Sequence, residues 1–464
     1  MSGRLSSGHA NLDVVLGGGL PTNAITMLIG APGSGKTILA QKYLFHNAAP
    51  ERPALYVTTV SEPLDKLVRY GQSLDFFDAT RVGRDVLYED LGTALHGDGL
   101  QGALQRLVEL LDTYQPGLLV IDSFKALGAF AADEQTFRRF LHELAGNLTA
   151  RAMSSFWIGE YDRKDATSAP EFAVADAIIS LETMRTAARE MRMLQVLKLR
   201  GSDFRSGEHA YRISSGGLRV FPRLADPIDT VGHTLGTQRV GTGIPALDEA
   251  LGDGYWPGSS TLVAGPSGTG KTVTGLHFVF EGGQLGEPGV YATLQENASQ
   301  LGRLASGFGW NLEGQGVHLM ARSPVDIYLD EWVYELLDEA ERTGARRIVV
   351  DSLGDLAAVS SDEQRFREYM YSLMQRCSRA GISLLLTLEI PELFSVGRLS
   401  DMGISHLADN VVLLQYIREQ SQVTRAMTVL KTRASHHHAQ IREFQISTDG
   451  IRLGEAISDA SQFG

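Results

Sequence analysis

Two stretches of this chain share one eight-residue pattern, a glycine-rich loop that ends in Gly-Lys-Thr. They read Gly30-Ala31-Pro32-Gly33-Ser34-Gly35-Lys36-Thr37 and Gly265-Pro266-Ser267-Gly268-Thr269-Gly270-Lys271-Thr272. In a phosphate-binding loop, glycines let backbone amides curl around phosphate oxygens, the lysine reaches the β- and γ-phosphates, and the threonine hydroxyl ligates Mg²⁺. The pattern predicts two nucleoside triphosphate sites, formed by Gly30, Gly33, Ser34, Gly35, Lys36 and Thr37 and by Gly265, Gly268, Thr269, Gly270, Lys271 and Thr272.

Each loop lies between a strand-like run and a helical pattern, the setting that a phosphate-binding loop needs. Residues 25–29 and 261–264 are the apolar runs directly before the loops. Further along, apolar runs alternate with amphipathic stretches such as residues 101–114 and 330–343. This alternation predicts an α/β fold, in which a mostly parallel, twisted sheet is flanked by helices and binds ligands at the carboxyl ends of its strands.

The sequence contains an internal repeat that predicts two copies of one domain. Its 464 residues exceed what a single hydrophobic core usually supports. The segment Gly-Leu-Leu-Val-Ile-Asp-Ser at 117–123 recurs as Arg-Ile-Val-Val-Asp-Ser at 347–352, and other segments recur in the same order. We therefore predict two tandem domains with a linker and a short polar tail, at residues 1–223, 239–454, 224–238 and 455–464 respectively.

Composition limits the class of protein. Apolar residues make up 43% and charged residues 21%, and no run approaches the length of a membrane span. A net charge of −13 makes the surface a poor attractor for nucleic acid, whose binding depends on phosphate neutralisation. The start lacks the apolar segment of a signal peptide, and one cysteine, Cys377, excludes an intrachain disulfide. We expect a cytoplasmic protein without membrane partners.

Two aspartates are candidates for holding Mg²⁺ together with Thr37 and Thr272. Asp122 and Asp351 each end an apolar run and occupy corresponding places in the repeat. This is the position of the Walker-B carboxylate, which holds the metal of a phosphoryl-transfer site through water. In the alternative interpretation each aspartate caps the helix that follows its Asp-Ser pair.

Two glutamates are candidates for polarising the attacking water or hydroxyl. Glu62 and Glu296 follow the strand after each loop helix, where a carboxylate would lie beside the γ-phosphate. Alternatively, each is a first-turn glutamate that faces a helix dipole. Glu160 and Glu389, after the next apolar runs, are second candidates.

Two pairs of cations recur far from the loops in sequence. Lys198 and Arg200 alternate in a strand-like segment, as do Lys431 and Arg433. Alternation places both cations of a pair on one face of a strand, from which they would reach a triphosphate bound by a neighbouring copy. The alternative is a charge pair on an exposed edge strand.

Several motifs together resemble the KaiC family, the duplicated RecA-like ATPases of circadian clocks and their relatives. They are Arg-x-x-x-Gly with Leu-Asp before each loop, the Asp-Ser pairs at 122–123 and 351–352, Lys-Leu-Arg-Gly at 198–201, and Ile-Arg-Glu-Phe-Gln-Ile-Ser at 441–447. The resemblance covers residues 4–454. It implies tandem RecA-like P-loop NTPase domains, a homo-hexameric double ring with ATP at subunit interfaces, slow hydrolysis in the first ring, and autokinase and autophosphatase activity on a Ser/Thr pair in the second.

The chain departs from this family at two places. The family's acceptor serine falls on Ser405, but its acceptor threonine falls on His406, which leaves one acceptor. A loop serine without this role is the alternative. The family's paired glutamates are replaced by Ser61-Glu62 and Gln295-Glu296. Glutamine orients water but does not take its proton, so we expect slow turnover at the second site and no clear inference to timekeeping.

Three functions remain open at this point. The first is an oligomeric, Mg²⁺-dependent ATPase with serine autokinase activity in signalling or regulation. The second is an ATP-gated scaffold with negligible turnover, and Gln295 favours it. The third is a DNA-dependent ATPase with the same RecA-like core, which the acidic charge and the lack of an appended basic module argue against.

Overall fold

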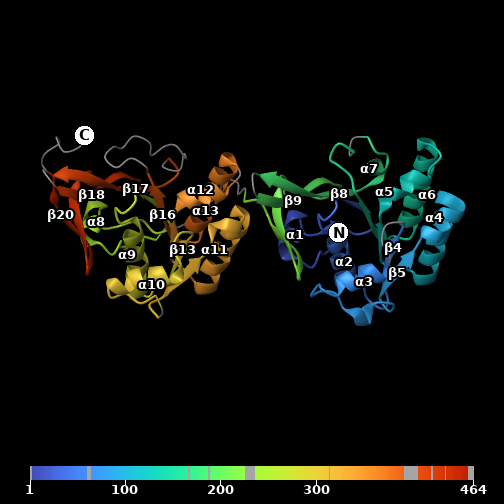
Figure 1. Cartoon of the computed structure of the whole chain (residues 1–464), viewed down its shortest axis with the longest axis horizontal. Coiled ribbons are helices and arrows are strands. Elements are labelled where there is room, and N and C mark those ends of the chain that lie inside the picture. Colours follow the sequence, from blue (N-terminus) through green and yellow to red (C-terminus); the bar gives the residue numbers. More distant parts are fainter. Residues whose placement is uncertain are drawn as a thin grey trace. The chain divides into compact units, whose positions relative to one another are not determined.

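The computed structural model describes residues 3–59, 64–165, 168–186, 189–224, 236–312, 314–360, 362–390, 406–419, 422–433 and 435–457. The chain divides into two compact units, Met1–Arg223 and Leu224–Gly464, and each is described by itself (Figure 1). Most of the predicted linker, residues 225–235, and the end of the predicted tail, residues 458–464, lie outside the described part. The last strand of the second unit ends at Ala456, two residues beyond the predicted boundary at 454.

The described residues of the first unit form eleven strands, the first two of which make a separate small ribbon. The strands are β1 (Arg4–Leu5), β2 (Leu20–Pro21), β3 (Ile25–Ile29), β4 (Ala54–Thr58), β5 (Val86–Asp90), β6 (Leu118–Asp122), β7 (Ser154–Gly159), β8 (Ala177–Thr186), β9 (Arg189–Leu199), β10 (His209–Ser214) and β11 (Gly217–Phe221). The helices are α1 (Ala10–Val15), α2 (Lys36–Asn47), α3 (Leu64–Gly71), α4 (Gly92–Tyr114), α5 (Phe124–Leu127), α6 (Glu134–Ala150) and α7 (Glu171–Val174), with short 3-10 turns at Ala79–Arg81 and Gly128–Phe130.

The main sheet of the first unit has nine strands in the order β11-β10-β9-β8-β3-β7-β6-β4-β5. The strands from β8 to β5 pair in parallel, whereas β9, β10 and β11 are added antiparallel at one edge. One face packs against α4, α5 and α6, and the other packs against α1, α2 and α3. Figure 1 shows α4 and α6 side by side on their face.

The second unit repeats this architecture. Its strands are β12 (Ser260–Gly265), β13 (Gly289–Thr293), β14 (Val317–Ala321), β15 (Arg347–Asp351), β16 (Ser383–Glu389), β17 (Asn410–Glu419), β18 (Gln422–Thr432), β19 (Arg442–Ser447) and β20 (Gly450–Ala456). Its helices are α8 (Pro245–Ala250), α9 (Lys271–Gln284), α10 (Ala298–Gly307), α11 (Leu329–Thr343), α12 (Leu353–Val359) and α13 (Glu363–Arg379), with a 3-10 turn at Pro324–Asp326.

The second sheet also has nine strands, in the order β14-β13-β15-β16-β12-β17-β18-β19-β20. The strands from β14 to β17 pair in parallel, and β18 to β20 return antiparallel. Helices α11, α12 and α13 cover one face and α8, α9 and α10 the other. The predicted α/β fold, two RecA-like sheets flanked by helices, is confirmed.

Alternating side chains explain why each central strand is apolar throughout. Met27 and Ile29 of β3 pack into the core beneath α4 and α6, whereas Leu28 between them packs toward α2. Because successive residues of a strand point to opposite faces, a strand covered on both faces needs an uninterrupted apolar run. This arrangement brings the ends of β3, β6 and β7 together at one edge, where polar residues follow.

Glycine conformation sets the turn from strand to helix at each loop. Gly35 and Gly270 precede the first residues of α2 and α9 with φ of 94° and 108°. This left-handed region costs glycine little and costs other residues much more. The chain therefore turns sharply from the end of β3 or β12 into the helix. Among the described residues, no helix is long and apolar enough to cross a membrane.

A buried arginine at the start of β15 is a polar anchor of the second core. The Arg347 side chain is 1% exposed, and its guanidinium bonds Glu287 at 2.7 and 2.9 Å. It also donates to the carbonyls of Gly241 and Phe278 at 2.8 and 2.9 Å. The first unit has Leu118 at the matching strand position.

We predict that Arg347→Leu lowers the free energy of unfolding of the second unit by about 2–3 kcal/mol, because two buried carbonyls lose their donor. The Glu287 side chain is 40% exposed, so its carboxylate regains water in the variant, which limits the loss of stability. Urea denaturation followed by circular dichroism measures it. Arg346→Leu, at the exposed neighbouring residue, should change stability by less than about 0.5 kcal/mol; an equal loss in both variants would contradict the anchoring role.

Candidate functional site

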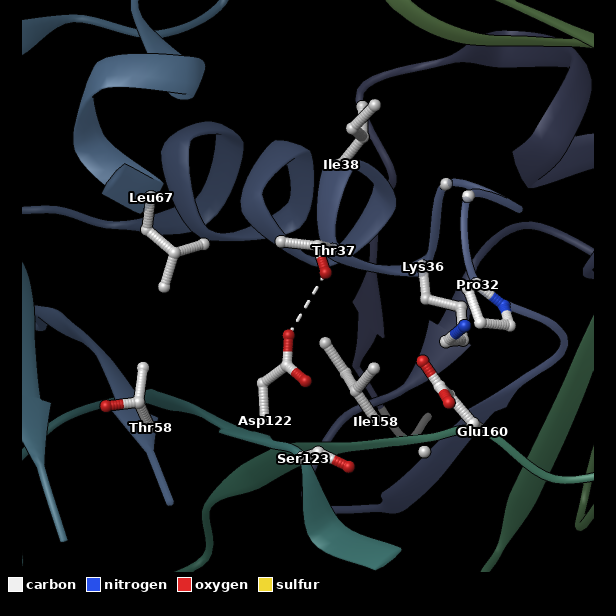
Figure 2. A pocket seen from close by; sticks show the side chains of 13 residues that line it. Pro32, Lys36, Thr37, Ile38, Thr58, Leu67, Asp122, Ser123, Ile158 and Glu160 are labelled. Atoms are coloured by element: carbon white, nitrogen blue, oxygen red, sulfur yellow. Dashed lines mark hydrogen bonds between the residues drawn. The ribbon is translucent and has the colours of Figure 1, made fainter. Parts of the chain in front are cut away.

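A pocket of about 560 Å³ lies at the carboxyl ends of β3, β6 and β7, beside the first turn of α2. Figure 2 shows Thr37, Lys36, Asp122 and Glu160 converging on it. The pocket is lined by Pro32, Gly33, Gly35, Lys36, Thr37, Ile38, Thr58, Leu67, Asp122, Ser123, Ile158, Gly159 and Glu160. The first glycine-rich loop and the predicted metal carboxylate thus share one cavity.

Each loop lysine is folded over its own loop. Lys36 Nζ donates to the carbonyls of Gly30 and Ala31, both at 2.8 Å. Lys271 Nζ repeats these bonds to Gly265 and Pro266, again at 2.8 Å. Burial lowers the pKa of Lys36, while Glu160 and then Asp122 oppose this shift. The ammonium group is therefore held within the cradle that the loop backbone forms.

Each loop threonine is bonded to the predicted metal aspartate. Thr37 Oγ1 donates to Asp122 Oδ2 at 3.0 Å, as drawn in Figure 2, and Thr272 Oγ1 donates to Asp351 Oδ2 at 2.8 Å. A hydroxyl and a carboxylate are the oxygen ligands that Mg²⁺ prefers, and Mg²⁺ usually keeps water and substrate phosphates as its other ligands. The donor set in each unit therefore fits Mg²⁺ accompanying a triphosphate.

The glutamate candidates have different outcomes. Glu62 lies outside the described residues. Glu296 follows β13 and is half-buried, and burial and then the charge of Asp351 raise the pKa of its carboxyl group. Its Oε2 is buried without a hydrogen-bond partner in the described part of the chain. Glu296 thus lies close enough to Asp351, the predicted metal aspartate of the second unit, for the two charges to interact.

The second glutamate candidates lie near the loop lysines. Glu160 follows β7 and lines the first pocket, with its carboxylate on the side of Lys36 (Figure 2). Glu389 ends β16, and its charge is the largest opposing the burial that lowers the pKa of Lys271. Both units thus present a carboxylate near the loop from the strand between the loop strand and the Walker-B strand.

The cation pair of the first unit lies near the amino-terminal end of β3. The glycine-rich loop follows the opposite, carboxyl-terminal end of the same strand. Arg200 bonds Asp176 through its backbone amide at 2.9 Å and its guanidinium at 3.3 Å. Asp176 in turn accepts from the amide of Ile25, the first residue of β3. Lys198, nearby, donates to the carbonyl of Phe172. Since β3 rises about 3.3 Å per residue, the whole strand separates these cations from the loop at its far end.

The second unit repeats this separation. The amide of Arg433 donates to the Asp409 carbonyl at 3.0 Å, and Asp409 accepts from the amide of Ser260 at the start of β12. Lys431 Nζ donates to the Ala408 carbonyl at 2.6 Å. The His406 carbonyl accepts from both cations, at 3.4 Å from Lys431 and 3.1 Å from Arg433. Neither unit brings its cations to its own loop.

The candidate acceptor Ser405 lies outside the described residues. His406, the next residue, is described and exposed at this same edge of the second sheet. Its carbonyl is the acceptor for both Lys431 and Arg433.

Sequence reasoning missed several hydroxyl groups at these sites. Tyr56 and Tyr291 donate to Asp122 and Asp351, and Tyr211 donates to the loop carbonyl of Ser34 at 2.6 Å. The one available signal was that Tyr56 and Tyr291 recur at the same place in the repeat. In an apolar strand-like run, however, a tyrosine at this position is interpreted as a core residue.

The two sheets and their paired loops define a protein with tandem RecA-like P-loop NTPase domains. The family model described as "ATPase: KaiC" matches residues 5–225 and again 240–458. The chain belongs to the KaiC ATPase family.

Curated relatives agree with this assignment. The chain is 27% identical to the circadian clock oscillator protein KaiC of Picosynechococcus sp. strain PCC 7002, over 96% of this chain and 88% of that protein. It is 28% identical to the circadian clock protein KaiC3 of Synechocystis sp. strain PCC 6803, over 99% of this chain and 93% of that protein. A KaiC of Prochlorococcus marinus strain CCMP1375 is 27% identical over 99% of this chain and 94% of that protein.

Proposed function

We propose that this protein is a cytoplasmic, homo-hexameric ATPase that hydrolyses Mg²⁺-ATP at interfaces between its copies and phosphorylates its own C-terminal unit on Ser405. Its output is signalling or regulation. The relatives are named as circadian clock proteins, but the replacement of the paired glutamates and of the acceptor threonine favours a regulatory role over timekeeping.

The proposed roles of the residues follow from their places around the two glycine-rich loops. The loop backbones with Lys36 and Lys271 hold the β- and γ-phosphates. Thr37 with Asp122, and Thr272 with Asp351, hold Mg²⁺, which neutralises charge on the β- and γ-oxygens when bound. Water attacks the γ-phosphorus, the bond to the β-phosphate oxygen breaks and ADP leaves. Glu296 accepts the proton of that water in the second site, and Glu62 is proposed for the first.

The location of the cations carries the proposal of interface catalysis. Phosphoryl transfer needs positive charge against the charge that develops on the transferred group. Both units hold their lysine–arginine pair at the edge away from their own loop, beside Asp176 or Asp409. A second copy that places this edge on the loop of the first would complete the site in trans.

The same geometry in the second unit supports the proposal of autophosphorylation. The cations Lys431 and Arg433 bond the carbonyl of His406, directly after Ser405. An edge that delivers these cations to a neighbour's triphosphate therefore also carries the acceptor segment to it. The serine hydroxyl would attack the γ-phosphorus, form the phosphoester and release ADP, and its proton would pass to Glu296 of the copy that holds the ATP.

A scaffold that binds ATP with negligible turnover is the second candidate. Gln295 is neutral and precedes Glu296. A glutamine orients water but does not take its proton, which slows general-base chemistry at the second site. In this alternative ATP binding controls assembly, and bound partners provide the output.

Incubation with γ-labelled ATP and Mg²⁺ tests the proposal. Released phosphate and label on the protein should both appear, and both should be lost in Lys36→Ala/Lys271→Ala. Ser405→Ala should lose the label and keep phosphate release. ATP-dependent assembly with neither product would support the scaffold instead.

Mixing variants tests catalysis in trans. In a Lys271→Ala background, which silences the second loop, Arg200→Ala should lower turnover about 10³-fold and keep ATP binding, because the cation acts on the transition state. The Arg200→Ala/Lys271→Ala variant is then mixed with the Lys36→Ala/Lys271→Ala variant. Turnover should return at interfaces that combine the intact first loop of one copy with Arg200 of the other. Arg138→Ala, on the outer side of α6, is the matched control. A mixture no more active than its components would place the arginine outside the neighbour's site.

The pH dependence of the second site tests the role of Glu296. Because its pKa is raised, Glu296 becomes ionised, and so able to accept a proton, at a higher pH than an ordinary glutamate. In a Lys36→Ala background, phosphate release should therefore rise as the pH passes through that raised pKa. Glu296→Gln should remove this rise and lower the rate about 100-fold. A Gln variant with an unchanged rate and profile would exclude Glu296 as the base.

A further inference from the structure

A buried tyrosine holds the metal aspartate in each unit. The Tyr56 hydroxyl, on β4, donates to Asp122 Oδ2 at 2.5 Å across to the neighbouring strand β6. The Tyr291 hydroxyl, on β13, donates to Asp351 Oδ2 at 2.7 Å across to β15. In both units the same carboxylate oxygen also accepts from the loop threonine. The contact is therefore part of the repeated site and not a feature of one core.

The tyrosine is always the donor in this bond. Both rings are fully buried. A tyrosine phenol is protonated near neutral pH, and a carboxylate has no proton to donate. A carboxylate oxygen that accepts from a phenol and from a threonine hydroxyl has its rotation fixed by two directional bonds from different elements.

The second unit adds one more hydroxyl. Thr387 of β16 donates to Oδ1 of Asp351, so hydroxyl groups from three elements hold this carboxylate. Groups that hydrogen-bond a metal-site carboxylate orient it and tune its basicity, and their loss typically costs about 10–100-fold in metal affinity or activity.

We propose that Tyr56 and Tyr291 are positioning residues for Mg²⁺, each holding its aspartate against the loop threonine in the arrangement that the metal of a bound nucleotide requires, with Thr387 assisting in the second unit. The inference rests on the proposed function, because it concerns the metal of the same nucleotide site. A tyrosine that served only the core would use the aspartate as a convenient acceptor, and its hydroxyl would then matter for stability but not for metal.

The experiment measures how much Mg²⁺ tightens nucleotide binding. The full-length chain carries Lys271→Ala to isolate the first site, and the affinity for N-methylanthraniloyl-ATP is measured in EDTA and in Mg²⁺. Tyr56→Phe removes one oxygen and keeps the ring. The affinity in EDTA should be unchanged and the tightening by Mg²⁺ reduced about tenfold. In a Lys36→Ala background, Tyr291→Phe and Thr387→Val should each reduce the tightening, and the double variant should reduce it further.

Tyr88→Phe is the matched control. Tyr88 of β5 lies against Tyr56 with ring centroids 5.4 Å apart, and its buried hydroxyl has no hydrogen-bond partner within the described ranges. It should keep the full tightening by Mg²⁺, and thermal melts of both variants report packing separately.

The outcomes separate the inference from the function on which it rests. Equal tightening in Tyr56→Phe and in the parent overturns the positioning role while leaving the nucleotide site intact. Equal loss in Tyr56→Phe and Tyr88→Phe overturns it in favour of packing. A parent that does not bind the nucleotide refutes the proposed function and the inference together.

Discussion

The bond between a threonine hydroxyl and an aspartate carboxylate links the parts on which the rest of each site depends. Thr37 lies in the first turn of the helix after the glycine-rich loop, and Asp122 ends a strand that β7 separates from the loop strand. The bond ties the loop, through the first turn of α2, to the end of β6. Because parallel strands covered on both faces all direct their carboxyl ends to one edge, the fold delivers these two residues to the same point in both units. Thr272 and Asp351 repeat the arrangement.

The sequence was sufficient for whatever depends on local pattern. The loops were identified by spacing, the strands by apolar runs, and Asp122 and Asp351 by their place after such runs in a repeated order. The fold class and the family are confirmed. Contacts across strands were not predictable, because alternation gives the face on which a side chain lies and not which strand lies beside it. Tyr56 was therefore interpreted as a core residue, although its hydroxyl contacts the Asp122 carboxylate because β4 lies next to β6.

The same limit applies to charge. Arg347 opens an apolar run and gives no local sign that it is buried, yet it is enclosed by Glu287 and two carbonyls. The predicted cation pairs were found by their alternation. Their location at the far edge depends on the antiparallel return of β9 and β18, which brings their ends back to the starts of β8 and β17. The burial of Arg347 and the location of the cation pairs both depend on which elements lie side by side in the folded unit. Neither is therefore predictable from a local sequence pattern.

The displacement of the cations from their own loops also restricts the symmetry of any assembly that uses them. A contact between a loop edge on one copy and a cation edge on the next joins two different surfaces, so the interface is head-to-tail and has a direction. Such contacts close into a ring only when the rotations from each copy to the next add up to a full turn. Otherwise they continue as a filament. Both units show the same displacement, so an assembly that used the cations of both would have two sets of directional interfaces, one formed by each unit.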